Sequence, residues 1–245
     1  GVNALTALHI GSKDDEGLKR TVHTAVIICL AGGILITVFG ILFSHNILAL
    51  MNTKDELIDG AVLYLRIYLL GMPALGLYNF GNAVLSAAGD TKRPLYYLAF
   101  AGVVNVILNL FFVIVCHLGV AGVALASMIS QFISAFLILR ALLTGKEKYC
   151  LRLSEIRFDK RKAVGILQIG IPSAFQYSLF AFANLFVQSS VNSFDHVLVE
   201  GNSAAANADP LVYDMMAAFY TACSSFIAQN FGARKKKRIL QTYLI

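Results

Sequence analysis

The amino-acid sequence predicts an all-α integral membrane protein, a polytopic bundle of helices. Of its 245 residues, 58% are hydrophobic and only 14% are charged, and the mean hydropathy is +0.70. Soluble domains have about 45–50% apolar and about 25% charged residues. Apolar segments of about 20 residues, the length that crosses a bilayer, recur along the chain. Helices are the expected spanning form, because an open sheet edge leaves backbone groups unsatisfied in lipid.

Six segments have the length and composition of membrane spans. The second contains Gly71, Pro73 and Gly76, which predict a kink because proline removes a backbone donor. Almost no chain joins the third and fourth, so these two predict a tight helical hairpin. Residues 1–10 are predicted to be the end of an earlier span. In chain order, the six segments are 21–43, 60–88, 94–117, 118–139, 163–192 and 203–231.

The basic residues gather in alternate connections between these spans. Among the 20 Lys and Arg residues, only Lys54 and Arg66 lie outside residues 13–20, 92–93, 140–162 and 234–238. Cytoplasmic loops of membrane proteins carry such an excess of cations. We therefore expect these loops to face the cytoplasm and the protein to lie in a cell membrane, the inner membrane of a bacterium. The net charge of +6 is then a topology signal, and we expect no nucleic-acid partner.

Two segments 221 residues apart are similar. Residues 7–13 (ALHIGSK) and 228–234 (AQNFGAR) both end a predicted span and carry glycine, a small residue and a cation in the same order. Six spans separate the copies, which suits a parallel repeat of six-span lobes. The four Cys residues show no CxxC or Cys/His spacing, so the sequence predicts no metal site.

Several motifs resemble those of the multidrug and toxic compound extrusion (MATE) family. Residues 229–233 (QNFGA) resemble the Q-N-x-G-A signature that ends the family's eighth span. Residues 89–94 (GDTKRP) resemble its G-D-T-x-x-P loop between spans four and five. Similar patterns occur along residues 105–124, at 170–173 (GIPS) and at 201–205 (GNSAA). The resemblance extends from the end of span two through span eight.

This resemblance implies that the chain is an interior part of a twelve-span, two-lobe transporter. Residues 1–143 would form the N-terminal lobe (the end of span two and spans three to six). Residues 144–162 would form a cytoplasmic inter-lobe linker, and residues 163–245 would start the C-terminal lobe with spans seven and eight.

The resemblance also implies a function in multidrug efflux and not in catalysis. Relatives are secondary antiporters that export cationic or amphipathic small molecules by alternating access, coupled to Na⁺ or H⁺. We expect no other cofactor and a monomer in the lipid bilayer. The chain departs from the family where relatives carry coupling acids: the acid of an N-x-x-x-D pattern in span five is Asn109, and a Glu of span seven falls near Phe180. The coupling ion therefore stays open.

Polar side chains at helical spacing within the spans indicate a cavity or a helix interface, because a polar group facing lipid is costly. Asn105 and Asn109 share one helix face. Asp214, on a face with Thr221, could exchange a proton or pair with Na⁺ or a cationic substrate. Ser173 and Tyr177 belong to a further stripe in span seven. The candidate substrate- or ion-binding residues are Asn105, Asn109, Asn184, Gln188, Asn207, Asp209 and Asp214.

Simpler interpretations stay open beside these. The polar stripes could hydrogen-bond between helices, which suits Ser127, Ser130 and Ser134 best, and Asp214 could be solvated at an outer mouth. A flippase for lipid-linked saccharides is the alternative function, but it needs cavity-facing cations, and Arg66 is the one candidate within the spans. The linker, with Leu153 and Phe158 among cations, either lies on the cytoplasmic leaflet or is a solvated basic loop.

Overall fold

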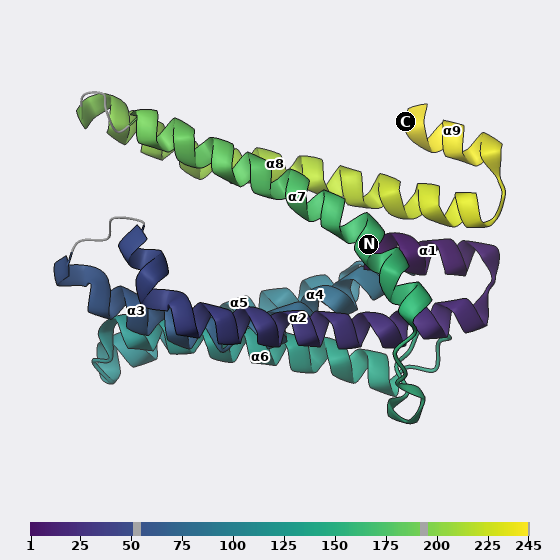
Figure 1. The fold of residues 1–245 in the computed structure, drawn as a ribbon, viewed down its shortest axis with the longest axis horizontal. Coiled ribbons are helices and arrows are strands. Elements are labelled where there is room, and N and C mark those ends of the chain that lie inside the picture. Colours follow the sequence, from purple (N-terminus) through teal and green to yellow (C-terminus); the bar gives the residue numbers. More distant parts are fainter. Residues whose placement is uncertain (51–54, 192–195, 245) are drawn as a thin grey trace. The chain divides into compact units, whose positions relative to one another are not determined.

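The computed structural model describes residues 1–50, 55–191 and 196–244, which form helices and short connections (Figure 1). Contacts divide the chain into two compact units. The first comprises Asp15–Ala163, and we call it the α2–α6 unit. The second combines Asn3–Asp14 with Val164–Ile245, and we call it the α7–α9 unit. The lobe boundaries expected from the sequence stay predictions.

The α2–α6 unit is a bundle of long helices (Figure 1). Helix α2 packs on α3 and α4, and α6 packs on α3, α4 and α5. Phe80, Leu85, Ile138 and Leu142 are fully buried between them. The bounds are α2 Asp15–Leu50, α3 Asp55–Leu69, α4 Met72–Ala87, α5 Lys92–Leu110 and α6 Gly119–Thr144, followed by a short 3₁₀ turn at Leu153–Glu155.

Four of the predicted spans are confirmed as helices with the length and hydropathy to cross a membrane, and a fifth corresponds to a bent pair of helices. Over the described residues, four stretches have the length and hydropathy of a membrane span: Asp15–Leu50, Lys92–Val115, Gly119–Thr144 and Lys160–Asn184. The fifth is the bent pair formed by α3 and α4. The sixth predicted span, 203–231, lies in α8 (His196–Gly232) and is not among these, so its crossing of the membrane stays a prediction.

The predicted kink is a break between α3 and α4. Helix α3 ends at Leu69, α4 begins at Met72, and the two axes differ by 43°. Pro73 lies in the first turn of α4, where its missing donor costs nothing. Gly33 of α2 faces the break, because a Cβ atom there would lie 2.6 Å from the Pro73 Cα. The glycine therefore lets α2 approach the backbone at the kink.

The predicted hairpin between the third and fourth spans is also confirmed. Helix α5 ends in a π-helical turn, Phe111–Val115, and α6 begins at Gly119. His117 and Gly119 adopt left-handed backbone conformations (φ 52° and 51°). The Leu118 N–H donates to the Phe112 carbonyl at 3.0 Å, which closes the turn.

The α7–α9 unit contains α1 (Val2–Ser12), most of α7 (Lys160–Val191), α8 and α9 (Lys236–Leu244). Helix α1 contacts α8, since Ser225 Oγ donates to Asn3 Oδ1 at 3.0 Å. The contact also includes Gly11 and Gly232. A Cβ atom on Gly11 would overlap the Gln229 carbonyl oxygen, and one on Gly232 would overlap the Leu8 carbonyl oxygen.

These contacts show that the two similar segments form a structural repeat. Leu8 and Gln229, like Gly11 and Gly232, are 221 positions apart, so each helix approaches the other through equivalent residues. Both helices end in the same way, with Lys13 and Arg234 left-handed at φ 57° and 56°. The closing hydrogen bonds correspond in pairs: Lys13 N to Ile10 O (3.2 Å) with Arg234 N to Phe231 O (3.0 Å), and Asp14 N to His9 O (3.1 Å) with Lys235 N to Asn230 O (2.9 Å).

Candidate functional site

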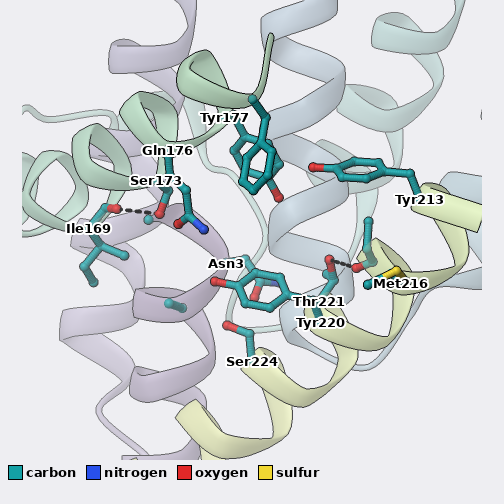
Figure 2. Close-up of a pocket in the computed structure, with 14 residues that line it drawn as sticks. Asn3, Ile169, Ser173, Gln176, Tyr177, Tyr213, Met216, Tyr220, Thr221 and Ser224 are labelled. Carbon is teal, nitrogen blue, oxygen red and sulfur yellow. Dashed lines mark hydrogen bonds between the residues drawn. The ribbon is translucent and has the colours of Figure 1, made fainter. Parts of the chain in front are cut away.

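A cavity of about 470 Å³ lies in the α7–α9 unit, lined by side chains from α1, α7 and α8 (Figure 2). Helix α7 contributes Ser173, Gln176, Tyr177 and Phe180, which recur every three or four residues. This spacing puts them on one helix face. Helix α8 contributes a second such face: Tyr213, Met216, Ala217, Tyr220, Thr221 and Ser224.

Aromatic rings dominate the cavity wall. Figure 2 shows the Tyr213 hydroxyl pointing toward Tyr177, with Tyr220 beside Thr221 on the same helix as Tyr213. These three tyrosines and Phe180 keep about half or more of their side-chain surface accessible. Tyrosine faces stack on flat apolar groups and attract cations, and the phenol groups donate and accept hydrogen bonds. The wall therefore suits a flat amphipathic molecule.

The Ser173 and Thr221 hydroxyl groups of the wall are available to a ligand as hydrogen-bond acceptors. Ser173 Oγ donates to the Ile169 carbonyl at 3.0 Å, and Thr221 Oγ1 donates to the Ala217 carbonyl at 2.8 Å. With those protons used, their oxygen lone pairs remain for a ligand, while the Gln176 amide can donate and accept. Among the described residues that line this cavity, none has a charged side chain.

A second polar cluster lies in the α2–α6 unit and contains two of the predicted site residues. Asn109 Nδ2 donates to Asn105 Oδ1 at 3.0 Å, and Asn105 Nδ2 donates to Ser130 Oγ at 3.3 Å. The second bond joins α5 to α6, as the helix-interface interpretation requires. The Asn109 Oδ1 atom is buried without a hydrogen-bond partner in the described part of the chain, and so is Gln131 Oε1. The cluster thus links α5 to α6, and its unpaired amide oxygens could still accept hydrogen bonds.

The other predicted site residues lie outside the cavity wall or outside the described side chains. Asp214 follows Tyr213 on α8, but its own side chain is exposed and does not line the cavity. Asn184 is exposed on α7, beyond Phe180. The side chains of Gln188, Asn207 and Asp209 are not described. A binding role for these residues stays a prediction.

The structure brings together residues that the sequence analysis missed. Ser173, Tyr177 and Thr221 were expected on polar stripes, whereas Gln176, Tyr213 and Tyr220 were not. Tyr213 and Tyr220 are seven residues apart, two helical turns, and Ser224 follows one turn later. A search for aromatic and polar residues together, rather than for amides and acids, would have found this face.

The described residues contain no group of three or more His, Cys, Asp or Glu side chains that could hold a metal ion. The chain has several apolar helices of spanning length, two helix ends related by a repeat, and a cavity lined by aromatic and polar side chains. These features are typical of a multi-pass membrane transporter.

Comparison with known proteins identifies the family. The MatE family profile matches residues 1–111. "Probable multidrug resistance protein YpnP" of Bacillus subtilis (strain 168) is 31% identical over 230 residues, which cover 94% of this chain and 51% of the relative. The "FAD transporter" of Shewanella oneidensis is 23% identical over 252 residues, covering 100% of this chain and 55% of the relative. The chain belongs to the MATE family, whose members are transporters and not enzymes.

The fold agrees with this assignment. A solved structure described as "Outward-facing conformation of a multidrug resistance MATE family transporter of the MOP superfamily" superposes with a TM-score of 0.89 at 22% identity. The match covers 100% of this chain and 55% of that one. The chain spans about half the length of the curated relatives that it matches.

Proposed function

We propose that the protein exports amphipathic or cationic small molecules as a secondary antiporter, by alternating access and in exchange for Na⁺ or H⁺. The observation that carries this proposal is the tyrosine-lined cavity between α1, α7 and α8. Two Bacillus subtilis relatives are named as probable multidrug resistance proteins, which supports the same substrate class. The proposal places the protein as a monomer in a bacterial inner membrane, with its basic loops in the cytoplasm.

The uncharged wall favours this function over a lipid-linked saccharide flippase. A flippase for anionic pyrophosphate lipids needs cations facing the substrate. No cationic side chain lines the cavity among the described residues. Arg66, the one cation within the predicted spans, donates from Nε to Ser44 Oγ at 2.9 Å in the other unit.

The function is tested with the full-length protein that carries this sequence, expressed in pump-deficient cells. The cells are loaded with a fluorescent cationic dye, and efflux is followed with and without Na⁺ and with a protonophore. We expect export that collapses when one of the two gradients is removed, which also names the coupling ion. No export by protein verified to be in the membrane would contradict the proposal.

Asp214 is the proposed coupling acid of this unit. It is an acid within α8 and directly follows the cavity-lining Tyr213, although its own side chain is exposed outside the cavity wall. Asp214→Asn should abolish ion-coupled efflux while the amount of protein in the membrane stays unchanged. Wild-type efflux by this variant would remove Asp214 from the mechanism without affecting the role of the cavity.

A further inference from the structure

The connection between α6 and α7 is a folded strap rather than a loose loop. Its residues 145–159, which we call the strap, belong to the α2–α6 unit. Two of its own residues, Cys150 and Leu151, are buried. Its contacts with the first turns of α2 are Lys148 to Asp15, Arg152 N to His23 Nε2 (3.2 Å), Glu155 to Lys19 (3.3 Å), Asp159 N to Thr24 Oγ1 (3.1 Å) and Asp159 to Arg20 (3.7 Å).

His23 and Thr24 are the two buried anchors, with 2% and 0% of their surfaces accessible. The His23 Nδ1 lies 2.7 Å from the Lys19 carbonyl and donates to it, while its Nε2 accepts from the Arg152 N–H. The neutral ring thus joins α2 to the strap with both nitrogen atoms used. Because of such anchors, the outer face of the strap has a fixed arrangement.

The carboxylates of this region are already engaged. Glu155 binds Lys19 and Arg152, and its pKa is held below the usual value chiefly by the hydrogen bond from Lys19. The pKa of Asp159 is lowered chiefly by the Lys162 backbone N–H. Glu16, also nearby, pairs with Arg20.

Three exposed cations lie near one another at the end of the strap and the start of α7. Arg157, Lys160 and Arg161 have accessible side chains and form no ion pair within the described part of the chain. Arg157 and Lys160 border a cavity of about 790 Å³ with polar walls, which Phe158 also lines. The local charge that is free to meet a ligand is therefore positive.

Two large apolar side chains stand among these cations. Leu153 is 72% and Phe158 is 59% exposed, although Leu151 on the same strap is only 4% exposed. A loop surrounded only by water gains nothing from turning a phenylalanine outward. Interfacial segments of membrane proteins combine such apolar residues with Lys and Arg.

The strap also lies where membrane-spanning helices end. Helix α2 begins at Asp15, α6 ends at Thr144 and α7 begins at Lys160, and all three have the hydropathy and length of spans. Because the strap joins α6 to α7 and packs on the start of α2, we infer that it lies at the level of the lipid headgroups.

We propose that Leu153, Arg157 and Phe158 on the outer face of the strap, with Lys160 and Arg161 at the start of α7, bind anionic phospholipids of the surrounding bilayer. The two apolar side chains enter the boundary between headgroups and acyl chains, and the cations contact the lipid phosphates. Each cation near an anionic surface favours binding by about fivefold. Since the strap is anchored to α2, bound lipid fixes the α2–α6 unit to the membrane surface just before α7.

The test uses fluorescence, because the chain contains no tryptophan. Phe158→Trp introduces one fluorophore at the proposed face. The variant chain is reconstituted in mixed phosphatidylglycerol and phosphatidylcholine vesicles, with bromine quenchers on the acyl chains of one lipid or the other. We expect brominated phosphatidylglycerol to quench at least about twofold more than brominated phosphatidylcholine at equal mole fraction, and high salt to reduce the difference.

A charge variant and a matched control complete the test. In the Phe158→Trp background, Arg157→Gln, Lys160→Gln and Arg161→Gln together should equalise the two quenchers. Lys13→Gln, Lys92→Gln and Lys235→Gln remove three exposed cations from other connections and should leave the preference intact. Equal quenching by both lipids before any charge is removed, no quenching at all, or an equal loss in the control would overturn the proposal. Lipids that co-purify with the unlabelled chain and its charge variant give the same comparison without the tryptophan.

Discussion

At the scale of single residues, the tyrosines of α7 and α8 give the cavity its chemistry. Tyr177, Tyr213 and Tyr220 present ring faces and phenol groups in one wall. Aromatic pairs contribute about 0.5–1.5 kcal/mol beyond the area that they bury. Stacking on such rings depends little on the exact outline of a ligand, which is consistent with a broad range of flat substrates.

Removal of one ring should weaken the binding of a flat cationic dye. For Tyr220→Ala in the full-length protein, we expect the Kd to rise about three- to tenfold, as the loss of about 0.5–1.5 kcal/mol requires. Tyr220→Phe retains the ring and should bind almost as tightly as the wild type. Fluorescence titration of the purified protein measures both constants. An unchanged Kd in the alanine variant would exclude Tyr220 from the binding wall.

Acidic groups of the strap should make its attachment depend on pH. The lowered pKa values of Glu155 and Asp159 mean that the folded strap favours their ionised forms. This contribution is present above the unfolded carboxyl pKa, about 4, and is lost as pH falls through the lowered folded values.

We therefore expect the strap to loosen below about pH 4. The anisotropy of the single tryptophan in Phe158→Trp, measured in detergent, should fall in that range. A second protein that combines Glu155→Gln and Asp159→Asn should show low anisotropy at every pH. A strap equally rigid at pH 3 and pH 7 would disagree with this account.

At the scale of elements, the crossing of α1 and α8 depends on two equivalent glycines. Gly11 and Gly232 each contact the backbone of the opposite helix, at positions related by the repeat. A methyl group at either site would meet a carbonyl oxygen of the partner helix, which cannot move without shifting the helix. Overpacking of this kind costs about 1–3 kcal/mol.

Gly11→Ala and Gly232→Ala should therefore destabilise the protein by similar amounts, about 1–3 kcal/mol each. Gly102→Ala is the matched control, because nothing lies within 4 Å of a Cβ atom built there. Thermal unfolding in detergent compares the three variants. If Gly11→Ala unfolds at the wild-type temperature, the close contact of α1 with α8 is wrong.

Elements whose signal is local were predictable from the sequence. Hydropathy predicted four helices of spanning length and the bent pair α3 and α4. Pro73 with its glycine neighbours predicted the break between α3 and α4, and a short connection predicted the α5–α6 hairpin. The repeat was visible as Gly, a small residue and a cation, because these residues end both helices with one backbone geometry.

The cavity was less predictable, because hydropathy does not distinguish a helix face toward lipid from one toward protein. Tyr213 and Tyr220 resemble ordinary apolar positions of a span until α1 and α7 are placed beside them. In the sequence, Asp214 attracts notice because it is a charged residue within an apolar segment. In the structure, however, its side chain does not line the cavity. The sequence alone does not distinguish whether the strap is an interfacial segment or a solvated loop, because its anchors, such as His23 and Arg152, are 129 residues apart.

At the scale of the whole molecule, this MATE-family chain carries a tyrosine-lined cavity in one unit and, in the other, the strap that we propose binds lipid. The central claim is that exported molecules pass through the cavity. If they do, filling it should stop transport while the fold persists.

The most direct test of this claim compares Ala217→Phe with Ala218→Phe in the full-length protein. Ala217 lines the cavity, whereas Ala218 is its exposed neighbour on α8 and does not. We expect Ala217→Phe to reduce dye efflux at least about tenfold, because the ring occupies the space of the substrate and overpacks its wall, with both variants present in the membrane at wild-type levels. Ala218→Phe should export normally. Full efflux by the Ala217→Phe variant would contradict the claim that this cavity carries the transported molecule.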